Sequence, residues 1–136
     1  EYAARNQGQG PALRYVWGEE PAPCGDAVLL VMNREDCNIT TTAPVCTHPT
    51  SHSEQGVCNL AGNLAEYTAD GAHPNFLGAP DDGRPWIDEG GVEKTIVRGG
   101  AYAGTDADSL VHRRFEWEID RPTANVGFRV ARTPAP

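Results

Sequence analysis

The chain has 136 residues, 39% of them hydrophobic, and a formal net charge of −8. This length suits one domain with a core of modest size. The acidic balance argues against nucleic acid or an anionic membrane as a partner. The longest apolar run, at 27–32, is the size of a strand and falls short of the ~18 apolar residues that a membrane span needs. We therefore expect no membrane span in this chain, and the 15 glycines and 11 prolines predict a loop-rich fold.

The N-terminal residues have the composition of a helix that has lost its beginning. Residues 1–5 favour a helix, yet no capping residue precedes them, while Asn6 and Gly8 supply a stop signal. We expect that a longer chain continues upstream, so the absence of a targeting signal is not informative. Residues 15–18 then form a short apolar anchor within a loop.

The four cysteines all lie in the first half of the chain. No Cys-x-x-Cys pair is present, which argues against a zinc site. An even count in a loop-rich chain favours disulfides and an oxidising compartment, and the alternative is four buried free thiols in a cytosolic protein. Among the three pairings, we favour the two that close short local loops, each contributing about 3 kcal/mol. These pairs are Cys24–Cys37 and Cys46–Cys58.

The middle of the chain reads mostly as irregular structure. Residues 27–32 are either a buried strand or a single turn of helix, and the pattern leaves both open. Residues 38–56 are rich in Thr, Ser and Pro, so we expect His48 and His52 to lie in a solvated loop rather than to bind a metal. Residues 59–68 favour a short helix after a turn.

The second half is predicted to hold strands joined by a long loop. Residues 70–93 are rich in Gly, Pro and Asp and predict a surface loop, in which Trp86 is an anchor or, alternatively, part of a binding lid. Residues 94–98 and 126–132 predict strands. In the second strand the alternation places Val126, Phe128 and Val130 on a buried face.

Oxygen donors flank a glycine turn in the segment 58–67. Asn59 and Glu66 are seven residues apart with Gly62 between them. Calcium binds six to eight oxygens from carboxylates, amides and backbone carbonyls. The spacing alone is a weak signal for calcium and favours an asparagine-capped helix start with a surface glutamate.

Several short blocks, in this order, resemble the formylglycine-generating-enzyme (sulfatase-modifying factor) family. They are residues 1–5, 16–18, 43–45, 56–67, 96–102 and 125–132. The resemblance implies an α+β, loop-rich, C-type-lectin-like fold. It implies that residues 1–132 are the C-terminal part of one such domain, with the N-terminal half absent and 133–136 as a tail.

The resemblance also implies a structural calcium ion. Its ligands would be the side chains of Asn59 and Glu66 and the carbonyls of Gly62 and Leu64. Ala65 and Tyr67 depart from the family's tryptophans but remove no ligand. A second calcium site in the region 25–38 stays open, and its candidate ligands are Asp26, Asp36 and Asn38.

The family's catalytic cysteines are replaced in this sequence. Formylglycine-generating enzymes place two copper(I)-binding cysteines four and nine residues after the second glycine of the Gly-Gly motif, and here these positions are Gly104 and Ser109. We therefore expect neither copper nor iron within this chain. A polar cleft is implied at Arg98, Tyr102 and Arg113; the alternative is salt-bridged strand faces, which would also involve Arg114, Glu116, Asp120 and Arg129.

Two functions from different classes follow. The first is an extracytoplasmic (periplasmic, cell-surface or secreted) binding or structural domain, stabilised by calcium and disulfides, whose partner is an unidentified ligand or protein. The second is a non-haem metal oxidoreductase, similar to sulfoxide synthases, whose redox-metal ligands lie on the missing N-terminal segment. The variable proteins of diversity-generating retroelements, which display ligand-binding loops on this fold, offer a third precedent.

Overall fold

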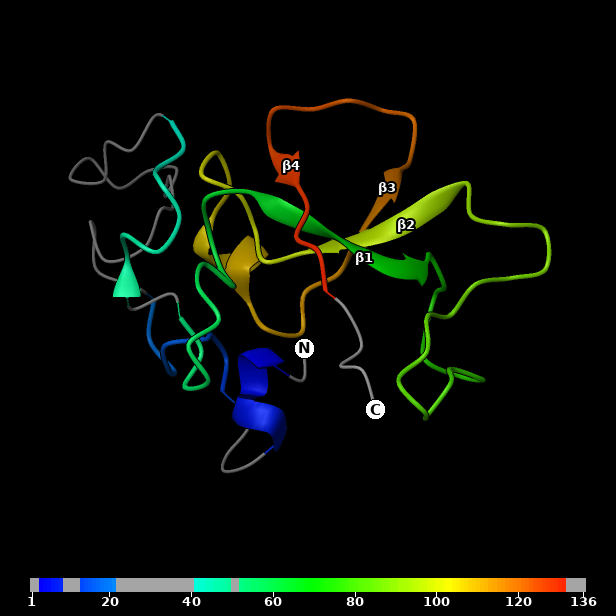
Figure 1. Ribbon diagram of the computed structural model, residues 1–136, viewed down its shortest axis with the longest axis horizontal. Coiled ribbons are helices and arrows are strands. Elements are labelled where there is room, and N and C mark those ends of the chain that lie inside the picture. The colour runs from blue at the N-terminus through cyan, green and yellow to red at the C-terminus, as the bar shows by residue number, and fades with distance from the viewer. Residues whose placement is uncertain (1–2, 9–12, 22–40, 50–51, 132–136) are drawn as a thin grey trace.

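The computed structural model describes residues 3–8, 13–21, 41–49 and 52–131 (Figure 1). A small mixed sheet and long connections make up this part of the chain. The elements are η1 (Ala3–Gly8), β1 (Ala65–Gly71), β2 (Lys94–Arg98), η3 (Asp106–Ser109), β3 (Phe115–Glu118) and β4 (Val126–Gly127). None of the described helices is long and apolar enough to cross a membrane.

The sheet has four strands in the order β3-β2-β1-β4. β2 lies antiparallel to both β1 and β3, whereas β4 lies parallel to β1 at the sheet edge and pairs through two residues (Figure 1). The strand predicted at 94–98 is confirmed as β2. Thr95, Ile96 and Val97 are buried in it, because β2 has a neighbour on each side.

One cluster of buried apolar residues joins β1, β2 and the segment that follows β2. Its buried members are Ala65, Val97 and Ala101, and half-buried side chains pack around them. These surrounding side chains are Tyr67, Phe115, Trp117 and Val126. Further buried apolar residues in the described part of the chain are Tyr15, Ala61, Ile96 and Val111.

The loop between β1 and β2 is anchored at its base and extends away from the sheet (Figure 1). The Trp86 amide donates to the Asp70 carboxylate at 2.9 Å, and the Gly71 amide donates to the Trp86 carbonyl at 2.9 Å. The Trp86 ring stacks on His73 with centroids 3.6 Å apart. The prediction of an anchored surface loop is therefore confirmed, and the Trp86 indole serves to hold the loop closed.

The N-terminal part agrees with its prediction in outline. The predicted helix is a 3₁₀ helix that continues past Asn6 and ends at Gly8. The apolar anchor is confirmed, because Tyr15 is buried, forms a bridge with Gly18 and stacks on Trp17. The apolar run at 27–32, the pair Cys24–Cys37 and the candidate second calcium site lie outside the described residues.

The helix predicted at 59–68 is wrong. Asn59, Gly62 and Asn63 have φ of 51°, 79° and 65°, in the left-handed region that interrupts a right-handed helix. The chain makes a tight loop through these residues and enters β1 at Ala65. Asparagine tolerates this conformation better than other non-glycine residues, but its sequence signal resembles that of a helix cap.

The strand predicted at 126–132 is much shorter than expected. β4 ends at Gly127, and Phe128 and Val130 are 76% and 87% exposed rather than buried. The alternating pattern continues past Gly127, but within the described residues the pairing with β1 does not. After Gly127 the backbone leaves β1, and Arg129 makes the contacts described below.

The two glycines of the Gly-Gly motif make close backbone contacts. A Cβ on Gly99 would lie 3.0 Å from the Leu60 carbonyl oxygen. A Cβ on Gly100 would lie 2.5 Å from the Ser109 hydroxyl and 3.1 Å from the Asp108 backbone. Both glycines also have φ in the left-handed region, at 94° and 69°. The motif is therefore required by packing as well as by φ.

We expect Gly100→Ala to lower the free energy of unfolding by about 2–4 kcal/mol, because it combines a left-handed alanine with overpacking. Gly83→Ala is the matched control: Gly83 also has a positive φ, of 80°, but a Cβ there meets nothing within 4 Å. Urea unfolding of both variants separates the two causes. If both variants lost the same free energy of unfolding, the contact with Ser109 would not contribute to the cost of Gly100→Ala.

Candidate functional site

The four predicted calcium ligands come together around one pocket. This pocket has a volume of about 410 Å³ and lies beside the disulfide. Its walls come from the loop before β1, from the start of β1 and from the chain after β4. They include Asn59, Gly62, Leu64 and Glu66, together with Arg129.

The loop that carries these residues is pinned on both sides. On one side, the Asn63 side chain accepts from the Ala43 amide at 3.1 Å and donates to the Ala43 carbonyl at 3.2 Å. On the other side, the Gly62 amide donates to the Gly99 carbonyl at 2.8 Å, and the Tyr102 amide donates to the Asn63 carbonyl at 2.8 Å. The turn around Gly62 is thus fixed by chain segments far away in sequence.

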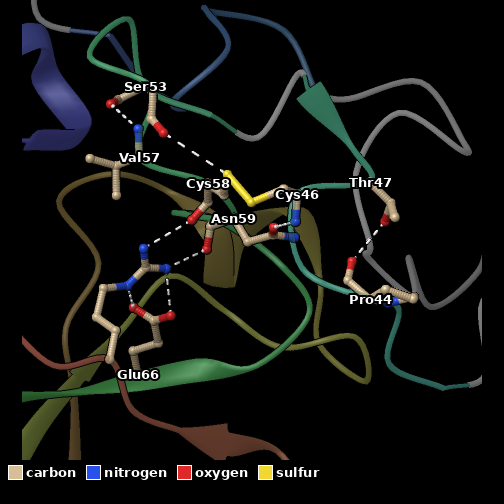
Figure 2. The surroundings of a disulfide bond; sticks show 10 residues. Pro44, Cys46, Thr47, Ser53, Val57, Cys58, Asn59 and Glu66 are labelled. Atoms are coloured by element: carbon tan, nitrogen blue, oxygen red, sulfur yellow. Dashed lines mark hydrogen bonds and ion pairs between the residues drawn. A yellow bond between two sulfur atoms is a disulfide. The ribbon is translucent and has the colours of Figure 1, made fainter.

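The Cys46–Cys58 disulfide holds the other end of this loop (Figure 2). Its Cα atoms are 5.1 Å apart, which confirms the predicted pairing. The Asn59 side-chain oxygen accepts from the Cys46 amide at 2.6 Å, so the two cysteines are held by a hydrogen bond as well as by the covalent bond. The Asn59 side-chain nitrogen is buried with no hydrogen-bond partner in the described structure.

A guanidinium group lies where the predicted site gathers its oxygens. Arg129 donates to both oxygens of the Glu66 carboxylate at 2.5 Å, to the Cys58 carbonyl at 2.9 Å and to the Asn59 carbonyl at 3.0 Å. Figure 2 shows a guanidinium group between the Glu66 carboxylate and the backbone of Cys58 and Asn59, with dashed lines to each. We call these four hydrogen bonds the Arg129 clamp. Bidentate, charge-assisted bonds of this kind are among the strongest in proteins.

The side-chain oxygen atoms of Asn59 and Glu66 are of the kind that calcium binds, but in this structure they already accept hydrogen bonds. Both carboxylate oxygens of Glu66 face Arg129, and the Asn59 side-chain oxygen faces an amide. The buried Asn59 nitrogen is a hydrogen-bond donor, which repels a cation. An ion at this position would have to compete with Arg129 for the oxygens of Glu66.

The predicted cleft residues do not share one cavity. Arg98 donates to the Val111 carbonyl at 2.9 Å and lines a pocket of about 390 Å³ together with Arg114. Arg113 is exposed and lies over the Phe115 ring, 4.6 Å from its centroid. The structure therefore brings Arg98 together with Arg114 rather than with Arg113. Tyr102 contributes its backbone amide to the loop before β1, as described above.

The positions corresponding to the family's catalytic cysteines lie around η3. Ser109 is 1% exposed, and its hydroxyl has no hydrogen-bond partner in the described structure. A Cβ on Gly104 would lie 3.1 Å from the Ala101 carbonyl and 3.1 Å from the Asp108 carboxylate. Asp108 is held there by the amide and hydroxyl of Thr105, at 2.8 and 2.9 Å. A side chain at position 104 would therefore crowd its neighbours.

Sequence reasoning missed two features of this region. It placed Arg129 among arginines of a cleft or of salt-bridged strand faces, whereas Arg129 binds the predicted calcium ligand Glu66. It also placed His52 in a solvated loop, whereas His52 Nε2 is buried beside the disulfide. The only early signal for the first pairing was that opposite charges sit in two of the recognised blocks.

We expect Arg129→Ala to lower the free energy of unfolding by about 2–4 kcal/mol and Glu66→Gln by about 1 kcal/mol, as measured by urea unfolding. Arg129→Ala removes all four hydrogen bonds, whereas Glu66→Gln leaves those to the two carbonyls and the partly exposed pair is screened by solvent. Arg84→Ala is the control, because Arg84 pairs with Asp82 in the exposed loop and its loss should stay within about 0.5 kcal/mol. A loss at Arg129 no larger than that at Arg84 would show that the clamp is not stabilising.

Comparisons with known proteins agree with this architecture. The solved structure of PvdO from Pseudomonas aeruginosa matches with a TM-score of 0.72 and 25% identity, over 93% of this chain and 47% of PvdO. Treponema denticola variable protein 1 matches with a TM-score of 0.51 and 20% identity, over 65% of this chain and 31% of that one. The chain thus spans about half the length of PvdO. No curated protein matches by sequence. The profile of the "Sulfatase-modifying factor enzyme 1-like domain" matches residues 1–134, so the chain belongs to this family.

Proposed function

We propose that this chain is part of a sulfatase-modifying-factor-like domain that serves as a binding or structural module rather than as a generator of formylglycine. The observation that carries the proposal is the absence of thiols around η3, where Gly104 and Ser109 replace the cysteines that the family resemblance implies. In the described residues the only sulfur ligands are those of the Cys46–Cys58 disulfide, which belongs to a different loop. Copper(I) needs soft thiolate ligands, and a glycine with a buried serine provides none.

The same proposal includes the C-type-lectin-like form of the fold and an extracytoplasmic location. A small mixed sheet carrying long, pinned loops supports the first. The Cys46–Cys58 disulfide supports the second, because such bonds persist in oxidising compartments. The alternative oxidoreductase function places its redox-metal ligands on residues outside this chain, and no described residue favours it.

Formylglycine generation is tested directly by incubating the chain with copper(I) and a cysteine-containing sulfatase-type peptide under air. We expect no conversion of the cysteine, measured by peptide mass, because no thiolate pair is available to bind copper and activate oxygen. A formylglycine-generating enzyme with both cysteines serves as the positive control. Peptide conversion above that of a copper-only blank would overturn the non-catalytic proposal.

We further propose that calcium binding at Asn59, Gly62, Leu64 and Glu66 is in competition with the Arg129 clamp. Both oxygens of the Glu66 carboxylate already accept hydrogen bonds from Arg129. Calcium would supply the same positive charge at the same carboxylate. The ion and the guanidinium would then be two ways to neutralise one partly exposed carboxylate.

This competition predicts that Arg129→Gln makes the stability calcium-dependent. Removing the guanidinium leaves Glu66 without its cation, so excess calcium should raise the Tm of Arg129→Gln by at least about 4 °C over the value in EGTA. The rise should be smaller in the wild-type chain and in the Arg84→Gln control. If Tm is the same in calcium and EGTA for all three proteins, the calcium proposal fails.

A further inference from the structure

A histidine lies against the disulfide and has an unused ring nitrogen. One ligand atom from each of Cys46, His52 and Cys58 lies within 4.8 Å of the other two. The Nε2 atom of His52 is buried and has no hydrogen-bond partner in the described structure. Buried polar atoms are nearly always hydrogen-bonded, so this nitrogen requires an explanation.

The three residues are held in place by hydrogen bonds that do not depend on the S–S bond. The His52 amide donates to the Pro49 carbonyl at 3.0 Å. A tight turn follows, in which the Ser53 amide donates to the Val57 carbonyl at 3.0 Å and brings the chain back to Cys58 (Figure 2). Cys58 is held through its carbonyl by Arg129, at 2.9 Å.

Cys46 is held separately, because its amide donates to the Asn59 side chain at 2.6 Å. Opening the disulfide would therefore leave two thiols and an imidazole facing one another across a short distance. The Cα atoms of Cys46 and Cys58, 5.1 Å apart, need only small movements for the sulfurs to separate to the spacing of two ligands on one metal ion.

We propose that reduction of the Cys46–Cys58 disulfide creates a zinc site formed by both thiolates and His52 Nε2. Two sulfurs and one imidazole nitrogen are a common ligand set for Zn²⁺, with water in the fourth position. The unused Nε2 is then the nitrogen that the ion would take. The site uses none of the four proposed calcium ligands, although it uses the disulfide that supports the proposed location.

The electron balance requires a reductant of the thiol or phosphine class. A dithiol would reduce the disulfide and become a disulfide itself; a trialkylphosphine becomes the phosphine oxide, taking its oxygen from water. In each case the two sulfurs receive two electrons and two protons. Cys46 is exposed, so a reductant can reach it. Zinc then displaces the two thiol protons, and its affinity rises with pH.

The test uses Co²⁺ as a spectroscopic probe of the full chain, with and without reduction by a water-soluble phosphine, which leaves no competing thiol. We expect a thiolate-to-cobalt charge-transfer band in the reduced chain alone, and its loss on addition of Zn²⁺. Circular dichroism reports whether the reduced chain stays folded. No band in the reduced chain, folded or not, would overturn the proposal.

Variants assign the ligands. His52→Ala removes a direct ligand of the ion. Losing a residue that only supports a ligand typically weakens metal binding by about tenfold or more, so His52→Ala should weaken Co²⁺ binding by at least about tenfold. His48→Ala is the matched control from the same loop and should bind as the wild type does. Cys24→Ser/Cys37→Ser should keep the band, and Cys46→Ser/Cys58→Ser should lose it. Unchanged binding in His52→Ala, or a band that persists without Cys46 and Cys58, would refute the assignment.

Discussion

The contact between Arg129 and Glu66 determines how the last part of the chain joins the rest. β4 pairs with β1 through two residues, which is too little to hold an edge strand by itself. Arg129 adds four hydrogen bonds, two to the carboxylate of Glu66 and two to the carbonyls of Cys58 and Asn59. Only a guanidinium has the planar, multiple donors for this geometry, so a lysine would not replace it.

The recognised sequence blocks contact one another in space, which explains why they appear together. The loop around Gly62 and Asn63 binds the Gly99–Tyr102 segment through two backbone hydrogen bonds. The Leu60 carbonyl lies so close to Gly99 that a Cβ on Gly99 would crowd it. Arg129 contacts the same loop through the carbonyls of Cys58 and Asn59. These fitted backbone contacts fix the loops against one another and against the start of β1.

Local chemistry in the sequence predicted some of these features and not others. The Cys46–Cys58 bond and strand β2 followed from short spacing and from a compact apolar run, and the family resemblance identified the loop that carries Asn59 and Glu66. The helix predicted at 59–68 failed because distant partners stabilise the left-handed φ of the asparagines there. The long final strand failed because alternation predicts an extended chain without showing whether a neighbouring strand exists. The partner of Glu66 is 63 residues away in sequence, beyond the reach of any periodic pattern.

Asn59 connects the clamp to the disulfide, and this connection bears on what the loop does when its chemistry changes. Its side chain holds Cys46, its carbonyl accepts from Arg129, and its left-handed backbone turns the chain toward Glu66. The two sets of contacts use different atoms of this one residue, so a shift of the Asn59 backbone would disturb the disulfide end and the clamp together.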